Sequence, residues 1–134
     1  MSGSHRYPCP CCGHQVFEEP PGSYDICGVC FWEDDGFQIA FPMMDGGANS
    51  NSLFESQQHF RQSGACEARF IGNVRPPDDD EPRDPDWRMF DPLTDPYLDY
   101  DCPEDLLLWR AATPEANLYY WQASYWLARG KRPA

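Results

Sequence analysis

Short stretches of alternating hydrophobic and polar residues fall in the first third of the chain. Residues 15–17 and 24–26 combine branched or aromatic side chains with polar ones, and the turn-forming sequence Pro-Pro-Gly-Ser separates them. This pattern predicts the two strands of a β-hairpin. Residues 37–41 also alternate apolar and polar side chains, which predicts a further half-buried strand.

A helix is predicted after these strands. The sequence Ser-Leu-Phe-Glu that begins at Ser52 has the form of a capping box, in which the serine and the glutamate each satisfy a free backbone amide. Gly64 suits the position where the helix ends, because glycine adopts a positive φ without strain. The face that packs on the rest of the domain would contain Leu53, Ser56 and Phe60.

The end of the chain is also predicted to be helical. Residues 104–112 favour a short helix, and residues 113–115 would restart it with a cap, a first-turn proline and a first-turn acid. We expect this last helix to reach residue 128. It would carry two neighbouring aromatic faces. Tyr119 and Trp126 would lie on the second face, which would either pack in the core or bind a partner.

Prolines and acidic residues are concentrated between residues 76 and 105. This segment holds seven prolines and twelve Asp or Glu residues against two arginines. It cannot form a continuous helix and lacks the apolar residues for a core of its own, so we expect an extended acidic arm. Large side chains would hold the arm to the rest of the domain: Trp87, Phe90, Leu93 and Tyr97.

Two Cys-x-x-Cys pairs add candidate metal ligands to the predicted hairpin. Each short turn can aim two sulfurs at one point, and the separation of the two pairs suits a single tetrahedral zinc site. Four thiolates would complete the coordination shell, which is typical of one structural Zn²⁺ ion rather than a catalytic one. The predicted ligands are Cys9, Cys12, Cys27 and Cys30.

The sequence also allows other roles for these cysteines. A reducing cytosol disfavours disulfides, and the βαβ context of a thioredoxin-like redox pair is absent, whereas an iron–sulfur centre also takes four cysteines. A nucleobase deaminase would need a His-x-Glu sequence, which the chain lacks. His14 could replace one ligand but suits a solvated strand position. Of the remaining thiols, Cys11 and Cys66 are expected to be small buried side chains, with Cys11 a candidate reactive thiol; Cys102 has no predicted role.

Paired carboxylates at Glu33, Asp34 and Asp35 form a second candidate site. Such a group can take part in acid–base chemistry or bind a cation, but it more often forms a solvated turn or caps backbone amides. No histidine, nucleophile or ligand-spaced set lies nearby, which favours the structural role.

Taken together, the segments predict a small α+β fold. A zinc-ribbon-like β-hairpin module and a capped helix would occupy residues 5–75. The acidic arm and the C-terminal helices, residues 76–134, would pack on this module as one globular unit.

Several motifs occur in a specific order along the first half of the chain. They include Tyr-Pro-Cys-Pro-Cys-Cys-Gly from Tyr7, Ile-Cys-x-x-Cys-Phe-Trp-Glu-Asp-Asp-Gly from Ile26, and Gly-Gly-Ala-Asn from Gly46. The set resembles the bacterial CPCC-type cysteine-rich family over about residues 5–75. The resemblance implies a bacterial, cytoplasmic, zinc-binding domain and provides no catalytic residues. Its members often carry proline after the third ligand, where this chain has Gly28, and we expect a slightly looser second turn.

Charge narrows the possible partners. The chain carries 22 acidic and 10 basic residues, a formal charge of -12, which repels nucleic-acid phosphates and suits a basic protein partner. No apolar run approaches the roughly 18 residues of a membrane span, and an odd number of cysteines is natural where thiols stay reduced, so we expect a cytoplasmic location. The arm has an acidic run that is either a solvated face or the partner surface: Asp78, Asp79, Asp80 and Glu81.

Three classes of function remain. The acidic charge and the missing catalytic set favour a non-enzymatic, zinc-stabilised protein-binding module, such as a bacterial antitoxin or immunity protein that masks a basic partner. An enzyme of unknown chemistry, using Cys11 or the turn at Asp35, is one alternative. A nucleic-acid-binding zinc ribbon is the other, although the basic residues are scattered.

Overall fold

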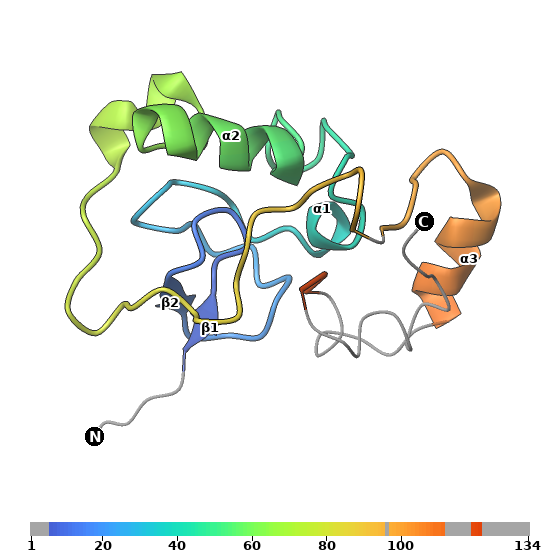
Figure 1. Ribbon diagram of the computed structural model, residues 1–134, viewed down its shortest axis with the longest axis horizontal. Coiled ribbons are helices and arrows are strands. Elements are labelled where there is room, and N and C mark those ends of the chain that lie inside the picture. Colours follow the sequence, from blue (N-terminus) through green and yellow to red (C-terminus); the bar gives the residue numbers. More distant parts are fainter. Residues whose placement is uncertain (1–5, 96, 112–118, 122–134) are drawn as a thin grey trace.

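The computed structural model describes residues 6–95, 97–111 and 119–121. In Figure 1, α2 lies along one side of the loops around β1 and β2, and α3 lies at the far end of the molecule from the two strands. None of the helices in the described ranges combines the length and the apolarity that a membrane crossing needs. The elements in chain order are β1 (Tyr7–Pro8), β2 (Gln15–Phe17), α1 (Gly36–Ala40), α2 (Leu53–Ser63), the 3-10 helix η1 (Ala68–Asn73) and α3 (Pro103–Ala111).

The β-hairpin encloses the first cysteine pair. β1 and β2 pair antiparallel, with Tyr7 opposite Phe17. Residues 24–26, the predicted partner of β2, form only an isolated bridge. That part of the prediction is wrong because the first cysteine pair is itself a tight turn, in which the Cys9 carbonyl accepts the N–H of Gly13 at 2.6 Å. The small α+β composition, with one two-stranded hairpin and a few helices, is confirmed.

Residues 37–41 belong to helix α1 and the chain segment just after it, so the predicted strand is wrong. Asp35 caps this helix, because its Oδ1 accepts the N–H of Phe37 at 2.8 Å. Over only five residues, alternating polarity cannot distinguish a strand from a single helical turn with one buried face. The buried positions are Gln38, Ile39 and Ala40.

Helix α2 begins and ends as predicted. The Ser52 side chain accepts the N–H of Glu55 at 3.1 Å, and the Glu55 carboxylate accepts the N–H of Ser52 at 3.2 Å. Gly64 ends the helix with a φ of 86° and donates to the carbonyl of Phe60. Leu53 and Ser56 are buried and Phe60 is partly buried against the core, as expected, and Gln57 is a further buried position.

The acidic arm is held by fewer side chains than predicted. Phe90 is buried, and its ring packs edge-on against the rings of Tyr97 and Tyr120, each with a centroid distance of 5.3 Å. Leu93 is 85% exposed instead. It lies in a turn in which the Asp91 carboxylate accepts its N–H, and this turn directs the chain away from the core.

The C-terminal part is described in two pieces. Helix α3 confirms the predicted short helix. Residues 119–121 form a turn rather than the predicted helix, and Tyr119 and Tyr120 are buried in the core. The rest of the predicted last helix, including Trp126, lies outside the described residues.

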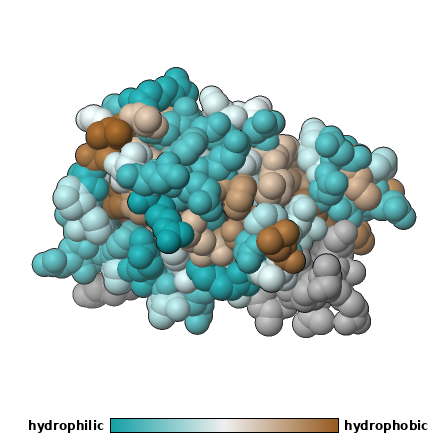
Figure 2. Space-filling model, turned by 45° about the horizontal axis from the view of Figure 1, so that its top comes forward, coloured by the Kyte–Doolittle hydropathy of each residue, from teal (hydrophilic) through white to brown (hydrophobic). Residues whose placement is uncertain are grey.

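The core is continuous from the cysteines to the arm. Figure 2 shows a largely hydrophilic face on which hydrophobic side chains form small separate groups, so most large apolar side chains have been removed from this surface. The largest fully buried apolar or aromatic side chains are Trp32, Phe41, Ile39, Leu53, Leu98 and Tyr120.

A buried amide joins three distant parts of the chain. Gln57 is 1% exposed. Its Nε2 donates to the Pro10 carbonyl and to the Tyr120 hydroxyl, both at 2.9 Å, and its Oε1 accepts the N–H of Phe90 at 2.8 Å. The Tyr120 hydroxyl in turn donates to the carbonyl of Arg88. Helix α2 therefore connects the first cysteine pair, the arm and the turn near the C-terminus.

We expect Gln57→Ala to lower the free energy of unfolding by about 3 kcal/mol, because it leaves buried partners without their hydrogen bonds. Urea denaturation monitored by tryptophan fluorescence measures this difference. Gln62→Ala is the matched control, since Gln62 is exposed on the same helix and its loss should cost less than about 0.5 kcal/mol. Equal effects of the two substitutions would contradict the role of Gln57.

Candidate metal centre

The two cysteine pairs form turns with the same hydrogen bonds. In the first turn, Cys9 donates its N–H to His14 at 2.9 Å and accepts from the N–H of Gly13. In the second, Cys27 donates to Trp32 at 2.9 Å and accepts from Phe31 at 2.8 Å. We call these the first knuckle (residues 9–14) and the second knuckle (residues 27–32).

Each knuckle needs a positive φ at the residue after its second cysteine. Gly13 has a φ of 82°, which glycine adopts freely, whereas Phe31 has a φ of 70°, which costs energy for a residue with a side chain. The Phe31 ring packs on Phe70, with the centroids 4.6 Å apart, and this contact helps to hold the strained residue in place.

The four sulfurs converge on one point. All four lie within 4.8 Å of one another and are fully buried. The Sγ atoms of Cys9 and Cys30 are 3.6 Å apart, and those of Cys12 and Cys27 are 3.8 Å apart. Four sulfurs at the usual zinc distance of about 2.3 Å, in a tetrahedron, would be about 3.8 Å apart. A disulfide, by contrast, requires about 2.05 Å. The group could therefore hold one metal ion.

The pKa values of these thiols favour a bound cation. Burial raises the pKa of Cys9 and of Cys30 well above the usual value of a thiol, whereas hydrogen bonding from Cys12 lowers the pKa of Cys27. One thiolate can thus be stabilised only while its neighbours stay protonated as donors. A bound cation removes this conflict, because it allows all four sulfurs to ionise. The N–H of Val29, 3.4 Å from the Cys27 sulfur, adds a further donor.

Comparison with known proteins agrees with this geometry. The family model described as "Cysteine-rich CPCC" matches residues 7–81, which contain both knuckles, α1, α2 and η1. The chain belongs to the cysteine-rich CPCC family. No curated protein matches the chain.

In this CPCC protein the first knuckle is covered by a segment from the arm, residues 81–87, which we call the strap. Arg83 Nε donates to the carbonyl of Cys12 at 3.0 Å, and the N–H of Asp84 donates to the carbonyl of Gly13 at 2.8 Å. Trp87 Nε1 donates to the carbonyl of Pro10 at 2.8 Å. The strap therefore satisfies backbone carbonyls that the tight turn leaves without partners inside the knuckle.

Gly13 is required by the strap as well as by its φ. A Cβ atom at this position would lie 2.6 Å from Cδ2 of Trp87, which is an impossible distance. The indole ring consequently packs directly on the knuckle backbone. The strap starts where the family-model match ends, so this cover lies almost entirely in the part of the chain that the match does not include.

A second contact holds the other knuckle. The N–H of Arg75 donates to the carbonyl of Gly28 at 3.1 Å, and its guanidinium makes two hydrogen bonds to the Glu81 carboxylate, at 2.7 and 2.9 Å. This pairing lowers the pKa of Glu81. A Cβ atom on Gly28 would lie 3.1 Å from the guanidinium, so glycine at this position leaves room for Arg75.

The carboxylates after the second knuckle are structural. Asp34 Oδ2 accepts from the hydroxyl of Ser23 at 2.8 Å and from two backbone amides, and burial raises the pKa of Asp34. Asp35 caps α1 with one oxygen and accepts the N–H of Ala48 at 2.9 Å with the other. These bonds match the predicted capping role and occupy three of the four carboxylate oxygens, whereas Asp34 Oδ1 is buried without a hydrogen-bond partner among the described residues.

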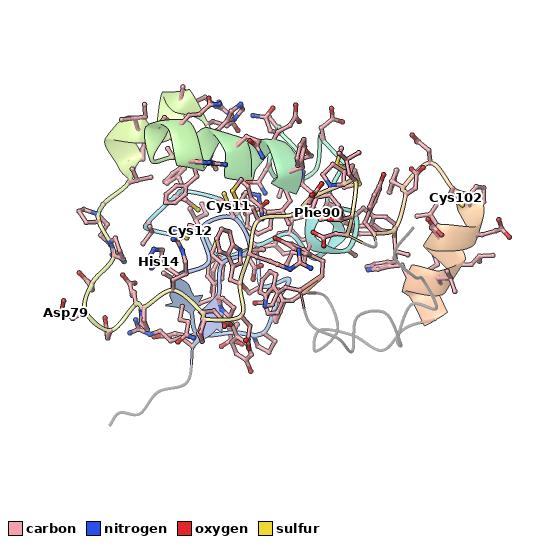
Figure 3. All side chains as sticks on the ribbon, viewed as in Figure 1. Cys11, Cys12, His14, Asp79, Phe90 and Cys102 are labelled. Atoms are coloured by element: carbon pink, nitrogen blue, oxygen red, sulfur yellow. The ribbon has the colours of Figure 1, made fainter. Side chains whose placement is uncertain are left out.

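The remaining thiols and His14 lie at or beyond the edge of the metal group. Cys11 and Cys66 are buried, and burial raises the pKa of both thiols, which disfavours the nucleophilic thiolate. His14 binds the carbonyl of Glu81 through Nδ1 at 2.8 Å, so it contacts the strap and is not one of the four converging ligands. Cys102 lies by α3, well away from Cys11 and Cys12 (Figure 3).

The residues predicted to bind a partner divide into two groups. Asp78, Asp79 and Asp80 are exposed, and Asp79 lies on the outer edge of the arm (Figure 3). Glu81 is buried under Arg75, and Tyr119 is buried with its hydroxyl donating to the carbonyl of Pro8 at 2.8 Å. Glu81 and Tyr119 are therefore part of the interior in this structure, because their polar atoms already form bonds with other parts of the chain.

Spacing in the sequence identified the four sulfurs but not the residues that cover them. The covering residues lie more than 40 residues after the knuckle that each contacts, and no local pattern links them to the cysteines: Gln57, Arg75, Arg83 and Trp87. Only the large apolar ring of Trp87 gave a signal, since it was expected to hold the arm to the domain.

We expect Trp87→Ala to increase the rate at which a chelator removes the bound metal by about tenfold, because one hydrogen bond and the ring cover of the first knuckle are lost. Stopped-flow absorbance with a chromophoric chelator measures the rate. Trp109→Ala is the matched control: Trp109 packs on Phe37 at a centroid distance of 4.4 Å, in α3 rather than at the knuckle. The role of the strap would be refuted if both variants released metal at the same rate.

Proposed function

We propose that the chain is a non-enzymatic protein-binding module of the bacterial cytoplasm, stabilised by one structural zinc ion in a zinc-ribbon-like site, and that its partner is a basic protein. A bacterial antitoxin or immunity protein that masks a basic toxin is one form of such a module. The observation that carries the proposal is a completely buried four-sulfur group combined with an uncompensated acidic surface.

The sulfur group supports zinc in a structural role. Its spacing matches a tetrahedral single ion, and sulfurs within 4.8 Å of one another leave no space between them for a multi-iron cluster. Four thiolates also leave no open coordination position for a substrate or water. Both features support a fold-stabilising ion rather than a catalytic one.

The charge distribution supports a basic partner. The net charge is -12, and several arginines are already neutralised within the chain. A surface of this kind attracts a basic protein over long range and repels nucleic acids. The arginines that pair with carboxylates are Arg6, Arg69, Arg75 and Arg88.

Enzymatic chemistry has less support. Catalysis would need a nucleophile and a base within hydrogen-bonding reach. The Cys11 thiol is buried with a raised pKa, and backbone amides donate to Asp34 Oδ2 and to both carboxylate oxygens of Asp35. No observation on the described residues favours an active site over a binding surface.

We expect the purified protein to contain about one zinc ion per chain and to lose its fold when a chelator removes it, because metal binding supplies much of the folding free energy of such small sites. Mass spectrometry of metal content and near-ultraviolet circular dichroism measure both. Cys27→Ser should abolish the bound zinc, whereas Cys102→Ser should leave it unchanged. A folded, metal-free wild-type protein would contradict this part of the proposal.

Affinity capture from the source cell tests the partner. We expect a basic protein to be retained at low salt, to be insensitive to nuclease treatment and to be released by high salt, because exposed charge pairs are screened. Mass spectrometry identifies it. Cys27→Ser is the control, since it keeps the charge of the chain but removes a ligand. Loss of capture after nuclease treatment, or equal capture by this variant, would refute a specific protein-binding surface.

A further inference from the structure

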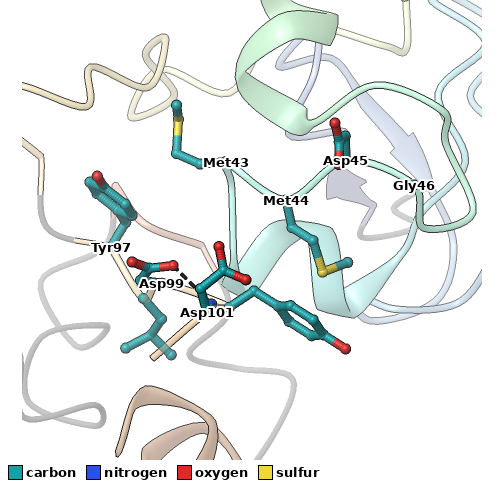
Figure 4. A pocket seen from close by; sticks show the side chains of 9 residues that line it. Met43, Met44, Asp45, Gly46, Tyr97, Asp99 and Asp101 are labelled. Carbon is teal, nitrogen blue, oxygen red and sulfur yellow. Dashed lines mark hydrogen bonds between the residues drawn. The ribbon is translucent and has the colours of Figure 1, made fainter. Parts of the chain in front are cut away.

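The described residues contain a hollow far from the sulfur group. It has a volume of about 490 Å³ and lies between residues 43–46, which follow α1, and residues 97–101, which precede α3. Figure 4 shows the two segments facing each other, with Met43, Met44 and Asp45 on the first and Tyr97, Asp99 and Asp101 on the second. A volume of this size is typical of a site for a small molecule or a side chain.

The apolar walls of the hollow are held in place by the core. Leu98 is fully buried. The ring of Tyr100 meets Phe41 edge-on at a centroid distance of 5.6 Å, and the ring of Tyr97 meets Phe90 in the same way at 5.3 Å. Both tyrosines are thus positioned by buried phenylalanines while remaining partly accessible, so the aromatic surface of the hollow is preformed.

The polar groups of the hollow have a single sign of charge. Asp45, Asp99 and Asp101 line it and are exposed, and no arginine or lysine is among its lining residues. Within the part of the chain that the structure describes, none of these three carboxylates takes part in an ion pair. In the acidic run of the arm, by contrast, Asp80 and Asp78 lie 3.2 and 3.8 Å from arginine nitrogens.

The backbone keeps two of these charges close together. Asp99 Oδ1 accepts the N–H of Asp101 at 2.9 Å (Figure 4), and the N–H of Asp99 donates to Asp105 at 2.8 Å. This turn places two like charges on one side of the hollow, where they give a negative potential that attracts a cation.

We propose that this hollow receives an arginine side chain from a basic segment of the protein partner. A guanidinium ion can form paired hydrogen bonds with carboxylates and can stack on an aromatic ring, and the hollow presents both groups beside the apolar surface of Met43 and Met44. The occupant is a protein side chain because the walls suit the guanidinium together with its apolar stem. This inference rests on the proposed function and assigns the surface on which the partner docks.

The test uses the full chain loaded with metal and a defined probe, an acetylated and amidated peptide of alternating arginine and glycine. We expect titration at low salt to shift the backbone amide signals of residues 43–46 and 97–101 in nitrogen-15 NMR spectra. Asp45→Asn/Asp99→Asn/Asp101→Asn should weaken the binding about tenfold, which corresponds to three exposed charge pairs of about 0.5 kcal/mol each. Asparagine keeps the oxygen that accepts the turn hydrogen bond.

The matched control changes the charge by the same amount elsewhere. Asp78→Asn/Asp79→Asn/Asp80→Asn should weaken the peptide by less than about twofold, because these side chains lie on the arm and not at the hollow. Tyr100→Leu should weaken it by about two- to fivefold through loss of the cation–π contact, with the net charge unchanged. Equal losses in the two aspartate variants would show attraction by net charge alone and would overturn the proposal.

Two further outcomes separate this proposal from its alternatives. Peptide binding that appears only after Arg129, Lys131 and Arg132 are replaced by glutamine would identify the chain's own basic residues as the occupant and overturn docking of a partner. In the cell capture experiment, a partner retained equally by the wild type and by the Asp45/Asp99/Asp101 variant would refute the hollow while leaving the proposed function intact. A wild type that captures no protein would refute the function, whatever the peptide titration shows.

Discussion

Four thiols buried within 4.8 Å of one another are the constraint on which this structure depends. Burial raises the pKa of Cys9 and of Cys30, and a cation bound among the four sulfurs would favour their ionisation. The two knuckles bring the four sulfurs together, and both use the same pattern of backbone hydrogen bonds. Each places two sulfurs on one side of a tight turn and then reverses the chain through a positive φ, at Gly13 and at Phe31.

Tight turns leave outward-facing carbonyls that must find partners elsewhere. Here the partners come from distant segments: Trp87 and Gln57 both donate to Pro10, and Arg83 donates to Cys12. The acidic arm is therefore an integral cover of the metal group rather than an appended tail. Its hydrogen bonds run to the backbone, so they depend on the shape of the knuckle and not on particular side chains there.

The carboxylates of this acidic chain fall into two groups. The carboxylates near the second knuckle, Asp34 and Asp35, are consumed as caps, and Glu81 is consumed by Arg75. Those around the hollow at residues 97–101 have no such partners among the described ion pairs. The carboxylates that form internal bonds are thus separated in space from those around the hollow. Both groups are acidic residues of the same kind, so composition alone does not locate a binding surface.

Local sequence patterns were enough to predict the four converging sulfurs, the capped helix α2 and the short helix α3, because ligand spacing, capping and helix stops act over a few residues. Contacts between distant parts of the chain set the remaining features. Residues 37–41 formed a helical turn because Asp35 capped it, and residues 24–26 lost their predicted place in the hairpin to β1. Likewise, the burial of Glu81 and Tyr119 depends on carbonyls and charges far away in the chain, and a local pattern carries no information about contacts over such distances.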